Sequence, residues 1–210
     1  MMPRMALRVR PARPDDLAVA DLLYESAARY YDAYAGSPRR ARRVLAAVYP
    51  RRAHTASWEI CRVAEVDGAV VGVMAAFPAR AGDRLARRFL GLTVSRMPAW
   101  RWPIVLRHLR ASAKLTPAPP PDSIYVDALA VAEHARRRGV ARALLDDAEA
   151  LAQEAGAAGV ALDTGVENDA AQALYASAGF ERRGERRARD SRVARAVGGA
   201  GFISYFRPVG

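Results

Sequence analysis

The sequence predicts a mixed α/β or α+β fold, in which helices flank one sheet. Two β-rich runs, 60–66 and 69–77, are separated by Asp67-Gly68, the strongest short-range signal for an antiparallel hairpin. Strand and helix patterns then alternate between residues 123 and 180, as in strand-helix-strand units. A length of 210 residues suits one well-buried domain and is short for two.

The N-terminal part of the chain begins with a strand and two helices. Residues 6–10 alternate apolar and basic side chains, as a half-buried strand does. Apolar residues recur at helical spacing over 17–31, after a turn rich in proline and aspartate. Pro38 and Pro50 delimit a second helix over about 38–49.

Residues 79–122 interrupt the succession of strands. The segments 84–92 and 103–115 have helical patterns, and "TPAPPPD" at 116–122 is extended and semi-rigid. We therefore expect a single domain over 1–210, with a helical insertion at about 79–122.

The C-terminal part returns to strands. We expect strands at 124–131 and 160–164, separated by a helix that begins near Gly139. A short helix stopped by Gly179 follows. The tail contains two strand candidates, 180–187 and 202–207, joined by a polar, arginine-rich hairpin arm.

The charge balance is basic, with a formal net charge of +11 and a pI near 10.7. Such values ordinarily indicate a polyanionic partner. Lys114 is the only lysine, however, so a general bias towards alanine and arginine supplies much of the charge. We expect no nucleic-acid partner. Trp100 and Trp102 are expected to fold the insertion onto the domain, over an acceptor cleft or a subunit interface, rather than to contact a membrane.

The remaining composition points to a cytoplasmic protein. No apolar run reaches the length of a membrane span, and "MMPRMALRVRPARPDD" is too interrupted for a secretory core. Cys61 is the single cysteine, which fits a reducing compartment, and the three histidines lack metal-ligand spacing. We therefore expect no metal site.

The stretch "ARRRGVARALL" lies between a predicted strand and a predicted helix. A helix N-terminus presents unpaired N–H groups and a positive dipole end, and both attract anions. Gly139 and Ala141 are small enough to let a phosphate approach the backbone. The alternative is that Arg136, Arg137 and Arg138 are merely exposed and that Gly139 eases a turn.

Two motifs here resemble the Gcn5-related N-acetyltransferase (GNAT) family. "LAVAEHARRRGVARALL" is similar to the family's acetyl-CoA signature, Arg/Gln-x-x-Gly-x-Gly/Ala after a strand. "VENDAAQALYASAGF" is similar to a second family motif further along the chain. The matching residues are Arg136, Gly139 and Ala141 in the first motif, and Asn168, Ala171, Leu174, Tyr175, Gly179 and Phe180 in the second. The resemblance is strong over 123–180 and loose over 7–77.

The resemblance implies a mixed, mostly antiparallel sheet with a central splayed parallel strand pair, which binds acetyl-CoA as co-substrate. Main-chain groups of Leu129, Ala130 and Val131 would contact the acetyl and pantetheine portions and the developing oxyanion. Asn168 would contact the cofactor arm or orient its loop, or it caps a helix. Main-chain amides would hold the pyrophosphate, from Arg136, Arg137, Arg138, Gly139, Val140 and Ala141.

Two side chains are the candidates for catalysis. Tyr175 matches the family's general acid, whereas its alternative is a core aromatic. Asp127 is our candidate for base or amine anchor, because an acid in a β-rich run is disfavoured unless exposed or functional. Strand alternation directs Tyr125 and Asp127 to one face. A carboxylate with an ordinary pKa near 4 is a poor base, so Asp127 would act through water, orient the amine, or serve a structural role.

The resulting hypothesis is an acetyl-CoA-dependent N-acetyltransferase that acts directly on a primary amine of a small molecule or protein. The alternatives are a non-catalytic CoA-binding regulator and a basic nucleic-acid-binding module; the latter leaves the two motifs unexplained. Glu25, Tyr30, Tyr31 and Asp32 lie where family members often cover the acceptor. The acceptor, the length of the acyl group and the choice between a monomer and a homodimer stay open.

Overall fold

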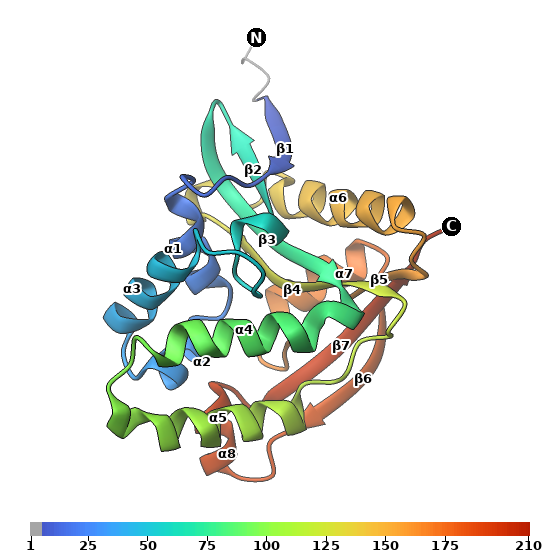
Figure 1. Ribbon diagram of the computed structural model, residues 1–210. Coiled ribbons are helices and arrows are strands. Elements are labelled where there is room, and N and C mark those ends of the chain that lie inside the picture. The colour runs from blue at the N-terminus through green and yellow to red at the C-terminus, as the bar shows by residue number, and fades with distance from the viewer. Residues whose placement is uncertain (1–5) are drawn as a thin grey trace.

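The computed structural model describes residues 6–210, the side chain of Ala196 excepted. These residues form a seven-stranded sheet of order β1-β2-β3-β4-β5-β7-β6 (Figure 1). The strands are Leu7–Pro11 (β1), Cys61–Val66 (β2), Ala69–Pro78 (β3), Ser123–Val131 (β4), Gly159–Gly165 (β5), Glu181–Arg187 (β6) and Gly201–Pro208 (β7). Within the described part of the chain, the β4–β5 pair is parallel and the other neighbours are antiparallel. The predicted fold class is confirmed.

Eight α-helices accompany this sheet in the described residues. They are Ala18–Ser26 (α1), Ala28–Ala35 (α2), Pro38–Val48 (α3), Gly82–Val94 (α4), Trp102–Leu115 (α5), Val140–Glu154 (α6), Asp169–Ser177 (α7) and Ser191–Val197 (α8). Short 3₁₀ turns cover Trp58–Ile60, Ala79–Ala81, Ala99–Arg101 and Glu133–Ala135. Residues 1–5, on which part of the expectation about a secretory core falls, lie outside the described residues.

The hairpin predicted at Asp67-Gly68 joins β2 to β3. Asp67 and Gly68 have φ angles of 50° and 83°, and both are left-handed. A two-residue turn of this hand matches the right-handed twist of the flanking strands, so the local sequence was sufficient to predict it.

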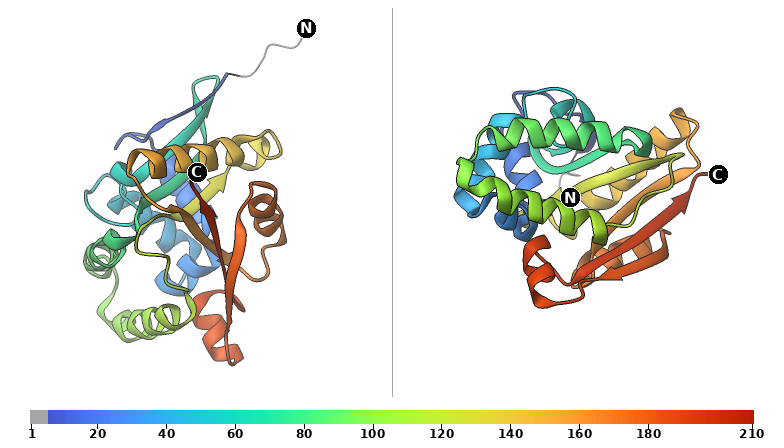
Figure 2. Two further views of the ribbon diagram at one scale, coloured as in Figure 1. Left: turned by 90° about the vertical axis from the view of Figure 1, so that its right-hand side faces the viewer. Right: turned by 60° about the horizontal axis from the view of Figure 1, so that its bottom comes forward.

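Helices cover both faces of the sheet (Figures 1 and 2). A hydrophobic cluster lies on each face. On the face covered by α1, α2 and α3, here called the α1 face, Leu23 and Leu45 pack against Val73 of β3. On the opposite α6 face, Leu144 and Leu145 are fully buried. A Cβ at Gly72 would lie 2.9 Å from the Val140 side chain, so this glycine allows α6 to approach β3 closely.

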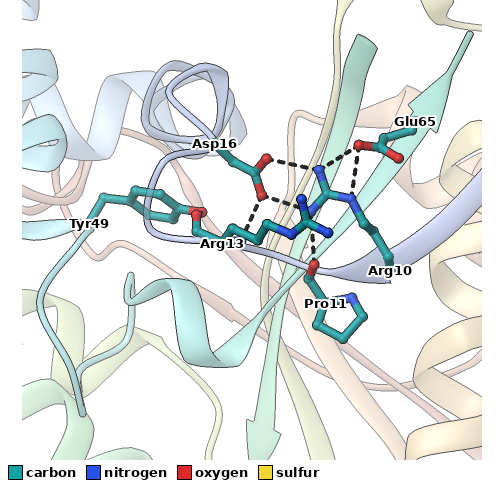
Figure 3. A network of polar contacts seen from close by, with 6 residues as sticks. All are labelled: Arg10, Pro11, Arg13, Asp16, Tyr49 and Glu65. Atoms are coloured by element: carbon teal, nitrogen blue, oxygen red, sulfur yellow. Dashed lines mark hydrogen bonds and ion pairs between the residues drawn. The ribbon is translucent and has the colours of Figure 1, made fainter. Parts of the chain in front are cut away.

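A polar network fixes the start of α1 against the sheet edge (Figure 3). Arg10 of β1 donates to Asp16 at 2.8 Å and to Glu65 of β2 at 2.5 Å. The guanidinium group holds the pKa values of both carboxyls below their usual range. Tyr49 follows α3, and its hydroxyl donates to the Arg13 carbonyl at 2.8 Å. The network thereby connects β1, β2, α1 and α3.

The helix expected over 17–31 is interrupted, because α1 ends at Ser26 and α2 begins at Ala28. The Ser26 hydroxyl donates to the Leu23 carbonyl at 2.7 Å, which competes with the helical backbone. Ala27, between the helices, has a φ of −149° and a ψ of 47°. This break redirects α2 towards the lower part of the sheet (Figure 1).

The sequence predicted a hairpin arm between β6 and β7. This prediction is wrong, because the segment contains α8. The Asp190 carboxylate accepts from the amides of Arg192 and Val193, and Gly198 ends the helix with a φ of 78°. These are ordinary start and stop signals. α8 contacts α2 and α5. A Cβ at Gly198 would lie 2.6 Å from the backbone of Arg29, so this contact is close.

The insertion forms the two predicted helices, α4 and α5, but its tryptophans do not fold it onto the domain. Trp100 is 65 % exposed and Trp102 is 52 % exposed, so the expectation that they fold the insertion onto the domain is wrong, whereas a place at a subunit interface stays a prediction. The buried Arg101 makes the connection, donating to the Ala33 and Tyr34 carbonyls of α2. A guanidinium group can bond several carbonyls at once, which an indole cannot.

Candidate active site

The two parallel strands at the centre of the sheet separate part of the way along their length. Residues 123–126 of β4 pair with 159–162 of β5. Beyond that point β4 continues along β3, and β5 continues along β7. Asp127 and Asp163 are therefore the first residue of each strand past the pairing. A ligand can pass between the two faces of a sheet only where its strands part in this way.

A β-bulge lies at Asp127. Ala75 of β3 is opposite Ala128, and the next residue, Ala76, is opposite Val126, so Asp127 is the extra residue. Val126 packs in the cluster on the α6 face, whereas Ala128 packs in the cluster on the α1 face. A bulge re-aims side chains and ends regular pairing. Here it reverses the alternation of β4 beside the separation of the strands.

Asp127 is accessible to solvent, although protein atoms surround it closely enough to perturb its carboxyl. Burial, and secondly the charge of Asp163, raise the pKa of Asp127 to about 7. The charge of Asp127 in turn contributes to raising the pKa values of Tyr30, Tyr31 and Cys61, for which burial is the first cause.

Asp163 lies across the separation from Asp127 and was missed by the sequence reasoning. The Tyr125 hydroxyl donates to its Oδ2 at 2.5 Å. Burial raises the pKa of Asp163 to about 6, while this hydrogen bond opposes the rise. The available signal was an acid within the apolar strand "GVALDTG", the same signal that drew attention to Asp127.

Tyr175 lies on α7 with its ring in the α6-face cluster. The ring centroid is 5.9 Å from that of Phe180 and 5.5 Å from that of Tyr205. Burial, followed by the charges of Asp163 and Tyr205, raises the pKa of the Tyr175 hydroxyl above its ordinary value. The hydroxyl consequently keeps its proton at neutral pH and lies close enough to Asp163 to sense its charge.

The loop before α6 has an alternating backbone conformation. Arg137 has a φ of 62° and Gly139 a φ of 80°, both left-handed. The Arg136 Nε donates to the Val131 carbonyl at 3.1 Å and thereby connects the loop to the end of β4. A Cβ at Gly139 would meet nothing within 4 Å. The glycine is therefore required by its φ angle, while the space above it stays open to a ligand.

The first turn of α6 presents amides to that open space. Amides at a helix start have no acceptor within the helix. Gly139 occupies the N-cap position of α6 and has no side chain that could accept from these amides. The side chains of Arg136, Arg137 and Arg138 are exposed around this turn. Left-handed residues that alternate with ordinary ones, followed by a helix N-terminus, favour an anion such as a phosphate.

The structure also places Leu129, Ala130 and Asn168, which the sequence singled out. Leu129 and Ala130 pair with β3, opposite Met74 and Val73. The Asn168 side chain accepts from the Ala171 amide at 3.2 Å and caps α7.

Among residues 6–210, no group of three or more His, Cys, Asp or Glu side chains could hold a metal ion. Within the same residues, no helix is both long and apolar enough to cross a membrane.

A mixed sheet whose central parallel strands separate beside a helix N-terminus defines an acetyltransferase-like fold. The acetyltransferase (GNAT) family model matches residues 21–180, and the chain belongs to this family. Acetyl transfer from acetyl-CoA is the activity of the family.

Solved structures share the fold at low identity. An N-acetyltransferase from Staphylococcus aureus Mu50 is 17 % identical with a TM-score of 0.70, covering 95 % of this chain and 100 % of its own. A structure described as an acetyltransferase is 18 % identical with a TM-score of 0.68, covering 97 % and 100 %. The ribosomal-protein-S18-alanine N-acetyltransferase from Escherichia coli is 17 % identical with a TM-score of 0.53, covering 97 % and 94 %. A search of the curated proteins found no match.

Proposed function

We propose that this protein is an acetyl-CoA-dependent N-acetyltransferase that transfers the acetyl group directly to a primary amine. The observation that carries the proposal is the position of Asp127 and Asp163, two carboxyls of raised pKa where β4 and β5 part. The anion-binding turn of α6 lies at the end of β4, beside the same separation. Groups that bind a phosphate and groups that accept a proton therefore flank one passage through the sheet.

The residues near α6 fit acetyl-CoA. Amides from Arg136 to Ala141 would hold its pyrophosphate, because they start a helix below open space. Alternate main-chain groups between Leu129 and Val131 are directed away from β3, towards the side on which β4 has lost its pairing with β5, and these groups would hold the thioester and its developing negative charge. Bound acetyl-CoA would supply the acyl group, which forms an amide with the amine nitrogen as the carbon–sulfur bond breaks.

Asp127 acts as the base in this proposal, with Asp163 beside it. An ordinary ammonium group has a pKa of about 10.4. Moving its proton to a carboxyl of pKa 3.8 costs about 9 kcal/mol, whereas moving it to Asp127 at about 7 costs about 5 kcal/mol. Because Asp127 is exposed to solvent, which weakens the rise in its pKa, the second figure is a lower bound. The raised pKa reduces the cost of using a carboxylate as the base.

Tyr175 supplies the proton for the departing thiolate, since burial keeps its hydroxyl protonated.

The burial of Cys61 favours direct transfer over a route through an acyl-cysteine. Cys61 is 1 % exposed on β2, and burial raises the pKa of its thiol, which disfavours the nucleophilic thiolate. Asn168 orients the loop before α7 through the capping hydrogen bond that its side chain accepts from the Ala171 amide.

The test combines ligand binding with turnover. Acetyl-CoA should raise the melting temperature, whereas DNA and RNA should not. A panel of primary amines, including alkylamines, spermidine and an N-terminal peptide, should then release free CoA. Stabilisation by acetyl-CoA without CoA release from any amine would identify the non-catalytic regulator instead. A cytoplasmic location remains a prediction. The choice between a monomer and a homodimer stays open.

A further inference from the structure

A cavity of about 420 Å³ lies on the α1 face of the sheet, next to the separation of β4 and β5. Tyr125, Asp163 and Phe206 of the sheet line it, and the proline-rich linker between α5 and β4 covers it. Figure 1 shows this linker passing from α5 towards the start of β4 beside β7. A volume of this size falls in the range of small-molecule sites, about 300 to 1,000 Å³.

The cavity has an apolar body and a carboxylate at the end nearest the strand separation. Pro117, Pro119 and Pro120 face Phe206 across it, while Asp163 is held by the Tyr125 hydroxyl. The lining cation, Arg183, lies 5.3 Å from the centroid of the Phe206 ring and pairs with Glu181. A second carboxylate, Asp122, is exposed on the linker, where water weakens its attraction for a cation.

The surrounding elements bound this side of the molecule. The Arg186 guanidinium donates to the Lys114 carbonyl at 3.3 Å and connects β6 to the end of α5. α8 packs closely on α2, where the Cβ of a residue in place of Gly198 would clash with backbone. The insertion and the β6–β7 connection thus meet through α5 and α8, and the linker that follows α5 lines the cavity.

We propose that the amine acceptor is a small monoamine with an apolar body, which lies in this cavity with its ammonium group against Asp163. The proposal rests on the proposed function and names its substrate class. The apolar body would pack between Phe206 and the linker prolines. A second ammonium group on the same molecule would lie among these side chains beside Arg183, with the solvent-exposed Asp122 as its one remaining carboxylate in the lining, and that arrangement is unfavourable.

The experiment measures CoA release from a series of linear amines, propylamine to hexylamine, with 1,6-diaminohexane, spermidine and an N-terminal peptide. Each added methylene should lower KM about three- to fourfold, the ratio expected for burying one CH₂ group. The diamine should show a KM at least about tenfold above that of hexylamine. Hexylamine should also raise the melting temperature of the CoA-bound protein, and Asp163→Asn should abolish that rise.

Two variants locate the site. Ala118→Trp places a large side chain on an exposed linker position of the cavity, and it should raise the KM for hexylamine at least tenfold. Ala113→Trp makes the same change on the exposed surface of α5, outside the cavity, and should leave that KM unchanged. Phe206→Ala should flatten the dependence on chain length; if it fails to fold, Ala118→Trp and the binding measurement decide.

The outcomes separate the two proposals. If spermidine or the peptide releases CoA faster than hexylamine and Ala118→Trp has no effect, the acceptor class is wrong and the acetyltransferase function stands. If acetyl-CoA binds and no amine releases CoA, the proposed function itself fails.

Discussion

Asp163→Asn tests whether the protein keeps an ionised carboxylate at an energetic cost beside the separation of β4 and β5. The ordinary pKa of this carboxyl is 3.8 and its value in the folded protein is about 6. The difference corresponds to about 3 kcal/mol at about 1.4 kcal/mol per pH unit. Because the folded pKa is the higher one, the folded state binds more protons between about pH 4 and pH 6. Stability therefore falls as the pH rises through that range, and the loss persists above it.

Asparagine resembles the protonated carboxyl in shape and can still accept from the Tyr125 hydroxyl. The variant should match the wild type near pH 4 and become more stable above pH 6. Asp163 is partly accessible to solvent, so we discount the gain to about 1–2 kcal/mol. For a domain of this size, that gain corresponds to a rise of about 2–8 °C in melting temperature.

Urea unfolding followed by circular dichroism, at intervals from pH 4 to pH 8, measures the difference directly. Asp122→Asn is the matched control, because it removes the same charge from an exposed position of the linker. Parallel stability curves for Asp163→Asn and the wild type across this range would show that Asp163 is not a strained carboxylate. A loss of stability at pH 8 would refute the reasoning equally.

Four further predictions follow from other contacts. Asp127→Asn, as a change to the proposed base, should lower kcat about 10²- to 10⁴-fold and remove the rise of kcat/KM near pH 7 in a CoA-release assay, whereas an unchanged profile would exclude Asp127 as base. Tyr175→Phe should lower CoA release with little change in melting temperature; unchanged release at every pH would exclude it as the acid. Gly72→Val should lower the free energy of unfolding in urea by about 1–3 kcal/mol and raise the Kd for acetyl-CoA, because the added side chain displaces α6. Leu144→Ala is the control: it should lower the free energy of unfolding by about 2–5 kcal/mol without displacing α6. Arg10→Ala should lower stability at pH 7 and lose that effect as the pH falls below about 4, because Arg10 keeps the pKa values of Asp16 and Glu65 low; an equal loss at pH 7 and pH 3 would contradict this.

The sequence was most informative where a local pattern has one structural meaning. The Asp67-Gly68 turn and the loop at Gly139 depend on short-range backbone preferences, whereas the parallel strands around α6 were expected from the family resemblance. The interruption at Ala27 and the helix α8 were misjudged, although Ser26, Asp190 and Gly198 carried signals for both. The tryptophans of the insertion were misassigned because aromatic character does not state which side of a helix faces the domain.

The sequence by itself determined the family motifs, the mixed sheet and one acid within a β-rich run as a candidate base. The tertiary structure alone decided that Asp163 lies across from Asp127, that a bulge at Asp127 reverses the alternation of β4, and that the linker between α5 and β4 covers a cavity beside Asp163. The physical reason is that a pKa and a cavity depend on neighbours distant in the chain. Thirty-six positions separate Asp127 from Asp163, and only the pairing of β4 with β5 brings them together.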